Sequence, residues 1–337
     1  MSGFPWAAGT ATGVGSLPGE SPIEAARLVA GELPDLPHVP ELPTRGPEAA
    51  FVGRTAGLLV DLHVDLQPSG WRLVSRPGRD ERRARSLLAQ DLDAVEEALT
   101  DYSGPLKAQA AGPWSLVASL ELERGERAVS DPGAVRDLTA SLTEGFVGHL
   151  AELSRRVPGA TLVAQIDEPA LPAVLAGRLP TASGYGTLRA VEPTVVENGL
   201  RAVLAAVAAA VPATVVHCCA PQPPVPLLRR AGATAVSLDA TLLDPSSDEA
   251  LGEVVDAGRG LFLGVVPSTD TRLSDPSGTV GPVRTLWRRL GFDPGRLSDA
   301  VVITPTCGLA AATPGYARAA LEHCRAAARS LVDNPEG

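Results

Sequence analysis

The stretch Thr214–Cys219 reads TVVHCC, an apolar, β-branched run that ends abruptly in a histidine and two cysteines. Side chains alternate between faces along an extended chain, so His217 and Cys219 point one way and Cys218 points the other. Zinc prefers imidazole nitrogen and thiolate sulfur, usually four ligands in a tetrahedron. The stretch therefore predicts a buried strand that ends in two metal ligands. The alternative is a buried histidine beside cysteines that serve only as small apolar residues.

Seven other apolar runs are typical of short strands, and most of them end at proline, glycine or a polar residue. With the run at 214–216, the predicted strands cover residues 11–17, 38–43, 107–112, 161–166, 214–216, 235–238, 261–266 and 300–305. Helical periodicity marks residues 47–64, 84–100, 132–156, 195–211 and 314–331. Three helices are predicted to begin at an N-cap residue followed by proline, at Ser21, Asp131 and Thr313.

Strands that alternate regularly with helices imply parallel strands joined by right-handed crossovers. Eight such units favour a closed barrel over an open, doubly wound sheet. We therefore predict an α/β protein with one domain, a (β/α)₈ TIM barrel over residues 1–337 with a core from about residue 10 to 331. Residues 13–18 lack the third glycine and the helix start of a dinucleotide-binding loop.

The composition limits the class of partner. The net charge is −10, which argues against nucleic acid or an anionic membrane surface as the main partner. The four cysteines do not resemble a disulfide framework, because two of them are adjacent. Residues 1–10 show no secretory signal, and the longest apolar stretch, 202–211, is too short to span a bilayer. We expect a cytoplasmic protein with free thiols.

Polar residues that a buried strand does not need gather at the predicted carboxyl ends of the strands. They are Ser16, Glu41, Asp167, Glu168, His217, Cys219, Asp239 and Cys307. In a barrel these ends open on one face, where active sites are built. Cys307 alone would be an ordinary buried cysteine, but beside His217 and Cys219 it is a natural third ligand. Asp239 is either the N-cap of the next helix or a fourth, oxygen ligand.

The pair Asp167-Glu168 precedes Pro169 at the end of the fourth predicted strand. Neighbouring side chains of a strand point to opposite faces, so one carboxylate can enter a pocket to bind an ammonium group or move a proton. The other is expected to make a structural hydrogen bond. The same three residues could also form no more than a turn.

Taken in order, these motifs resemble the C-terminal, catalytic barrel of cobalamin-independent methionine synthase, over about residues 10–330. The resemblance rests on the runs GVGS at 13–16, QIDEPAL at 165–171, HCC at 217–219 and TCGL at 306–309, together with Asp239. It implies a zinc-dependent transfer of a methyl group to the thiol of homocysteine, which yields methionine. It implies that His217, Cys219 and Cys307 bind Zn²⁺, and Asp239 stands where the family has a glutamate ligand.

The same resemblance implies a substrate site. Ser16 and Asp167 match residues that hold the amino-acid part of homocysteine, and Gln165 begins the same motif. Glu41 lies near a segment that in the family supplies another carboxylate for binding the substrate. After the seventh strand the family has a histidine that assists methyl transfer, whereas residues 264–270 read GVVPSTD. Asp270 is the candidate that takes its place as a catalytic residue.

The methyl donor is left open between two classes. Full-length members of the family carry a second, N-terminal barrel that these residues do not match, as in short, core-only relatives. The donor is accordingly a methylated folate or a methylcorrinoid. Three alternatives to the leading function are a related zinc barrel that methylates another thiol, an enzyme like uroporphyrinogen decarboxylase, and a zinc- or thiol-binding relative without turnover.

Overall fold

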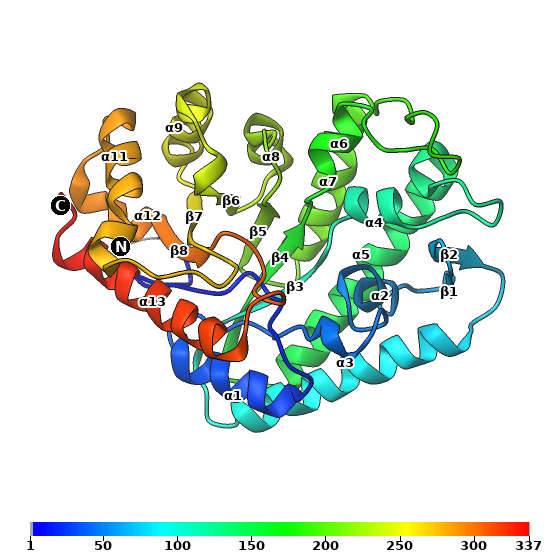
Figure 1. Cartoon of the computed structure of the whole chain (residues 1–337), viewed down its shortest axis with the longest axis horizontal. Helices are drawn as coiled ribbons and strands as arrows, with labels where there is room; N and C mark the ends of the chain where they lie inside the picture. Colours follow the sequence, from blue (N-terminus) through cyan, green and yellow to red (C-terminus); the bar gives the residue numbers. More distant parts are fainter. Residues whose placement is uncertain (1–2, 337) are drawn as a thin grey trace.

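The computed structural model describes residues 3–336, so Met1, Ser2 and Gly337 of the predicted domain lie outside it. At its centre six parallel strands pair in the order β3-β4-β5-β6-β7-β8. They are β3 Gly104–Ala111, β4 Ala160–Asp167, β5 Ala213–Cys218, β6 Ala235–Asp239, β7 Gly260–Val266 and β8 Val301–Pro305. The sheet curls into half a barrel with helices around it (Figure 1). Six of the eight predicted strands are thus confirmed as regular strands.

Helices precede the sheet and connect all its strands. The α-helices are α1 Pro22–Glu32, α2 Phe51–Ala56, α3 Arg79–Ala98, α4 Pro113–Ser119, α5 Pro132–Arg156, α6 Leu171–Leu175, α7 Pro193–Ala208, α8 Val225–Ala231, α9 Asp248–Asp256, α10 Pro276–Thr279, α11 Gly281–Leu290, α12 Leu297–Ala300 and α13 Pro314–Asp333. Single 3₁₀ turns are η1 Pro43–Arg45, η2 Ala128–Ser130, η3 Ala240–Leu242, η4 Pro245–Ser247 and η5 Pro294–Arg296. This alternation gives every connection between neighbouring parallel strands a helical crossover.

The three predicted N-caps are confirmed. The Ser21 hydroxyl accepts a hydrogen bond from the Glu24 N–H at 3.4 Å, and the carboxylate of Asp131 accepts one from Ala134 at 2.9 Å. Thr313 caps α13 in the same way, by accepting from the N–H of Tyr316. Each cap satisfies a backbone donor that has no partner inside the helix.

The two predicted strands at the N-terminal end do not form regular strands. Residues 11–17 and 38–43 pair only through single parallel bridges, Ala11 with Ile303 of β8, Ser16 with Glu41, and His38 with Lys107 of β3. The physical reason lies in their composition. Prolines at positions 37, 40 and 43 have no N–H to donate to a ladder, and residues 11–17 contain two glycines, which weaken a strand. The bridges nevertheless place Ser16 and Glu41 next to each other.

The helix predicted over 47–64 is wrong beyond Ala56. After α2 the chain forms an antiparallel hairpin of β1 His63–Gln67 and β2 Gly70–Val74. Asp61 has a φ of 58°, a left-handed conformation that no α-helix contains. The apolar residues of this segment are spaced as in a helix, but the alternation of HVDLQ and the turn before Gly70 favour a hairpin.

Side chains of the curled sheet divide into an inner and an outer cluster. Val215 of β5 belongs to the inner cluster, in which the rings of Trp6 and Phe262 pack edge to face. Cys218 is fully buried in the larger cluster between sheet and helices. Because alternate residues share a face, His217 points to the inner side with Val215, and the prediction that Cys218 packs elsewhere is confirmed.

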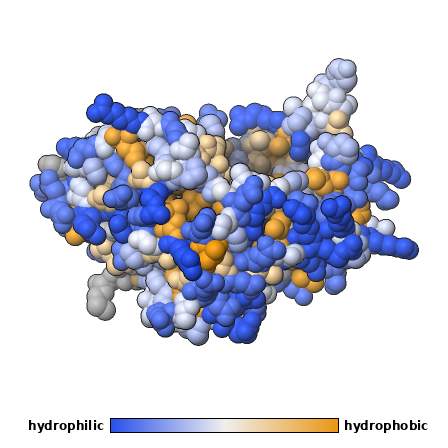
Figure 2. Space-filling model, turned by 60° about the horizontal axis from the view of Figure 1, so that its bottom comes forward, coloured by the Kyte–Doolittle hydropathy of each residue, from blue (hydrophilic) through white to orange (hydrophobic). Residues whose placement is uncertain are grey.

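Among residues 3–336, no helix combines the length and the apolar character needed to cross a membrane. The face shown in Figure 2 is mainly hydrophilic, and its hydrophobic side chains form small separate patches.

Candidate metal centre and pocket

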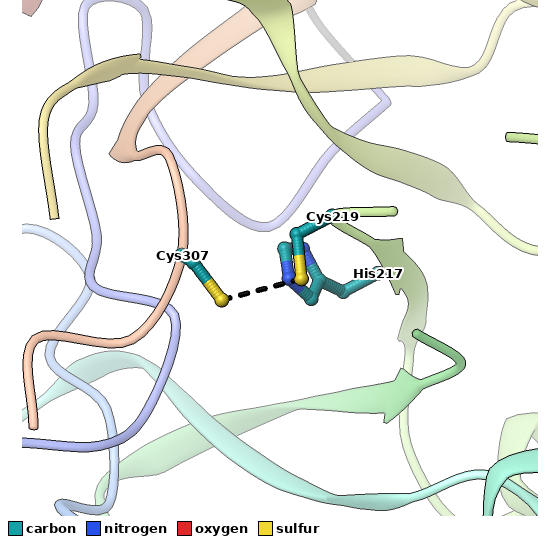
Figure 3. A group of neighbouring side chains, drawn as sticks. All are labelled: His217, Cys219 and Cys307. Atoms are coloured by element: carbon teal, nitrogen blue, oxygen red, sulfur yellow. Dashed lines mark hydrogen bonds between the residues drawn. The ribbon is translucent and has the colours of Figure 1, made fainter. Parts of the chain in front are cut away.

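Three of the predicted ligands meet at the open end of the sheet. One ligand atom each from His217, Cys219 and Cys307 lies within 4.8 Å of the other two. His217 is on β5, Cys219 follows that strand directly, and Cys307 lies just past the end of β8 (Figure 3). The two sulfurs are 3.2 Å apart. A curled parallel sheet brings these ends together although 88 residues separate the two cysteines.

The histidine is held in an orientation that suits a metal ligand. Its Nδ1 lies 2.9 Å from the hydroxyl oxygen of Ser237 on the neighbouring strand β6. Its Nε2 is buried and has no hydrogen-bond partner among the described residues. When Nδ1–H donates to Ser237, Nε2 carries a free lone pair, which is the usual arrangement of a metal-bound histidine. The residues present therefore fit a metal ion.

The two thiols influence each other strongly. The hydrogen bond shared with Cys219 and the nearby imidazole of His217 lower the pKa of Cys307 to about 4. The same contact and burial raise the pKa of Cys219. One thiolate therefore forms readily, and the second proton is held between the sulfurs until a metal replaces it.

A cavity of about 340 Å³ opens beside the three ligands. Its polar lining comes from Ser16, Glu41 and Asp167, three of the four predicted substrate-binding residues. The fourth, Gln165, lies behind the cavity, where its Nε2 donates to Asp167 at 2.7 Å and to the Val14 carbonyl at 2.9 Å. The apolar part of the lining includes Pro43, Phe51 and Pro169. The volume suits a small metabolite.

Asp167 faces the cavity while its neighbour Glu168 faces away. Burial raises the pKa of Asp167 to about 7, against the opposing effect of His217, which pairs with it across β4 and β5. The carboxylate of Glu168 is fully buried and accepts hydrogen bonds from the N–H of Trp114 at 3.0 Å and from the N–H of Ser115 at 2.7 Å. Glu168 thus makes the structural hydrogen bonds expected of one member of the pair.

Asp239 and Asp270, the other two predicted site residues, have other contacts. Asp239 accepts hydrogen bonds from the N–H and the hydroxyl of Thr241 and caps the 3₁₀ turn η3. Asp270 is exposed and accepts from the N–H and the hydroxyl of Thr313 at the start of α13. Neither lines the cavity as defined by the described residues. Their predicted roles as fourth ligand and catalytic residue remain predictions.

The sequence analysis missed the polar layer beneath the cavity. Lys107 is fully buried and donates to the Val14 carbonyl at 2.9 Å, and Gln109 donates to Glu41 at 3.0 Å. Arg54 lies 3.7 Å from Glu41 and pairs with buried Asp91. Lys107 and Gln109 stand in mid-strand and not at a strand end. Their period-two spacing on β3 was the signal that could have identified them.

The family of the chain follows from its similarity to known proteins. Residues 8–330 match the family model for the catalytic domain of cobalamin-independent synthase. The chain belongs to the cobalamin-independent synthase family. As a member, this catalytic domain is an enzyme of methionine synthesis, and the family's reaction is methyl transfer to homocysteine.

Solved structures show where the same fold occurs. A B12-independent methionine synthase from Shewanella sp. W3-18-1, in complex with selenomethionine, is 13% identical to this synthase domain. The match covers 96% of this chain and 97% of that one, with a TM-score of 0.59. Morphinone reductase (13% identity, 88% and 81% covered, TM-score 0.42) and 2,3-dimethylmalate lyase (13%, 93% and 79%, 0.40) are too distant to support an argument. No curated protein matches the chain.

A Ser237→Ala variant of the synthase domain is expected to bind zinc about 10- to 100-fold more weakly, because His217 loses the partner that orients it. Competition with a chromophoric zinc chelator measures the affinity. Thr234→Val is the matched control, since it removes a hydroxyl just before the start of the same strand, where it accepts a hydrogen bond from the N–H of Thr214. Equal zinc affinity of the wild type and the Ser237 variant would contradict the role of Ser237.

Proposed function

We propose that the chain is a zinc-dependent methyltransferase that converts homocysteine to methionine with a methylated folate as donor. The single observation that carries the proposal is one cavity lined by two chemically different groups of side chains. His217, Cys219 and Cys307 are the metal half of this lining, and Ser16, Glu41 and Asp167 are the amino-acid half. Homocysteine has a thiol at one end and an ammonium and a carboxylate group at the other.

In this proposal the amino-acid half selects the substrate. Glu41 and Asp167 accept hydrogen bonds from the ammonium group, and Gln165 keeps Asp167 turned toward it. The hydroxyl of Ser16 lies close to Gly308, where a Cβ atom would come within 2.0 Å of it. Gly308 therefore leaves room for Ser16 at the cavity wall. The selenomethionine bound to the Shewanella enzyme, an analogue of the product, supports an amino-acid ligand for this pocket.

The metal half holds the reacting sulfur. His217, Cys219 and Cys307 would hold the zinc ion, with Asp239 as the proposed fourth ligand if its side chain leaves Thr241. Zinc held there would stabilise the thiolate form of the substrate sulfur at neutral pH while leaving it nucleophilic. Pro43, Phe51 and Pro169 form an apolar wall that excludes water where the methyl group arrives.

Closure of the barrel and the cellular location are also part of the proposal. We propose that residues 11–17 and 38–43 complete the half-barrel to a closed (β/α)₈ barrel in one domain. The parallel bridges between these segments and to β3 and β8 support this. Two free cysteine ligands suit the reducing cytoplasm, which we propose as the location.

The test is an assay of homocysteine methylation with methyltetrahydrofolate and methylcobalamin side by side. We expect zinc-loaded protein to form methionine from the folate donor, with about one zinc per chain. Activity with methylcobalamin alone would move the donor to the corrinoid class. Methylation of other thiols but not homocysteine would favour a related zinc enzyme, and homocysteine binding without turnover would favour a relative that has lost the reaction. Full activity of metal-free protein would contradict the proposal.

A further inference from the structure

Lys107 is the only lysine of the sequence, and all the remaining basic residues apart from the histidines are arginines. It is fully buried in the middle of β3. It is not among the described residues that line the cavity. Burial of a cation lowers the stability of a protein unless the cation is paired, and every other basic position, histidines aside, is occupied by arginine. The contacts of its ammonium group indicate which neighbouring groups this lysine holds in place.

The ammonium group of Lys107 determines how Gln109 is oriented. Its Nζ lies 3.3 Å from Oε1 of Gln109. An ammonium group can only donate, so the amide atom facing it must be the oxygen. The amide nitrogen then faces the other way, where it donates to Glu41 at 3.0 Å and to the carbonyl of Val39 at 2.6 Å. If the amide were reversed, its oxygen would face a carboxylate and a carbonyl.

A second contact of Lys107 fixes the neighbouring wall. Its Nζ donates to the carbonyl of Val14, which also accepts from Gln165, the residue that orients Asp167. Val14 begins the wall that continues into Ser16, in a segment without regular strand hydrogen bonds. Burial lowers the pKa of Lys107 to about 8, with Asp167 and Glu41 opposing that effect, so the group is still a cation at neutral pH.

We propose that Lys107 is a positioning residue for recognition of the substrate ammonium group, because it sets the direction of the hydrogen bonds from Gln109 to Glu41 and anchors the wall at Val14. This inference rests on the proposed function, in which Glu41 and Asp167 bind the ammonium group. It goes further by giving selectivity for amino-acid thiols to a residue that never touches the substrate.

The test compares homocysteine with 4-sulfanylbutanoate, which has the thiol and the carboxylate but no ammonium group. Lys107→Met keeps the length of the side chain and removes the donor that holds Oε1 of Gln109 and the carbonyl of Val14. We expect KM for homocysteine to rise about 10- to 100-fold with little change in kcat, because ground state and transition state lose the same contact. The kcat/KM for 4-sulfanylbutanoate should change less than about threefold.

Gln109→Met is the second variant, and it keeps the lysine in place. It should show a loss of preference for homocysteine no larger than that of Lys107→Met, which also gives up the contact with Val14. The double variant should lose no more than Lys107→Met alone, since the contribution of Gln109 depends on Lys107. Arg284→Met is the matched control, because Arg284 of α11 is a buried cation that donates to the backbone carbonyls of Ser277 and Ser330 and does not line the cavity. It should lower stability without changing the preference.

The single lysine also permits a direct observation. Protein labelled with ¹⁵N at the lysine Nζ should give one ammonium signal, which shifts when homocysteine binds and stays in place with 4-sulfanylbutanoate. An unchanged preference in both variants, or losses that multiply in the double variant, would overturn the inference while leaving homocysteine methylation intact. A wild-type protein that neither binds nor methylates homocysteine would instead overturn the proposed function, and the inference with it.

Discussion

A Cys307→Ser variant is expected to purify with less than about one tenth of the zinc of the wild type and to form no detectable methionine. The hydroxyl of serine stays protonated where the thiol of Cys307 ionises readily, because its pKa is lowered to about 4. Loss of a direct ligand should exceed the 10- to 100-fold effect typical of residues that only orient a ligand. Elemental analysis of the purified protein gives the zinc content, and circular dichroism checks the fold.

Cys218→Ala is the matched control for this variant. Cys218 adjoins Cys219 in sequence, but its side chain is buried between the sheet and the helices. Its loss should cost about 1 kcal/mol of stability and leave one zinc per chain. If Cys307→Ser retained its zinc, Cys307 would not be a ligand, and the 3.2 Å contact between the sulfurs would need another explanation.

The parts of the site that could be predicted lie at strand ends. A polar residue after a buried apolar run is not needed for the packing of the strand, and parallel strands end at one edge of the sheet. His217, Cys219, Cys307 and Asp167 were predicted by that argument, and the structure brings them to one cavity. The sequence pattern could not show that Asp239 and Asp270 bond to nearby threonines, because the direction of a carboxylate depends on local donors.

The parts that could not be predicted depend on long-range contacts. Lys107 and Gln109 look like polar interruptions of a strand until Val14 and Glu41, which lie far away in sequence, are placed beside them. The two N-terminal segments, residues 11–17 and 38–43, do not form regular strands. Proline lacks an N–H and glycine weakens a strand, so these segments make few regular hydrogen bonds. Their place is set by bridges to β3 and β8, and no local pattern contains that information.

An Asp167→Asn variant is expected to bind homocysteine about 100-fold more weakly while keeping its zinc. The amide is as large as the carboxylate but has lost the charge that attracts an ammonium group, and contacts of a charged group lose more than neutral ones. Its nitrogen can also face the Nε2 of Gln165, which would place two donors against each other. Calorimetric titration of zinc-loaded protein with homocysteine gives the dissociation constant.

Glu168→Gln provides the control, because it makes the same chemical change one residue further along the chain. Glu168 points to the start of α4, where it accepts hydrogen bonds from Trp114 and Ser115. A side-chain amide would set a donor against one of these N–H groups, so the free energy of unfolding should fall by about 1–3 kcal/mol. Homocysteine affinity should stay within about twofold of the wild type. Opposite results, with Asp167→Asn binding normally and Glu168→Gln not, would mean that the ammonium site belongs to the other carboxylate.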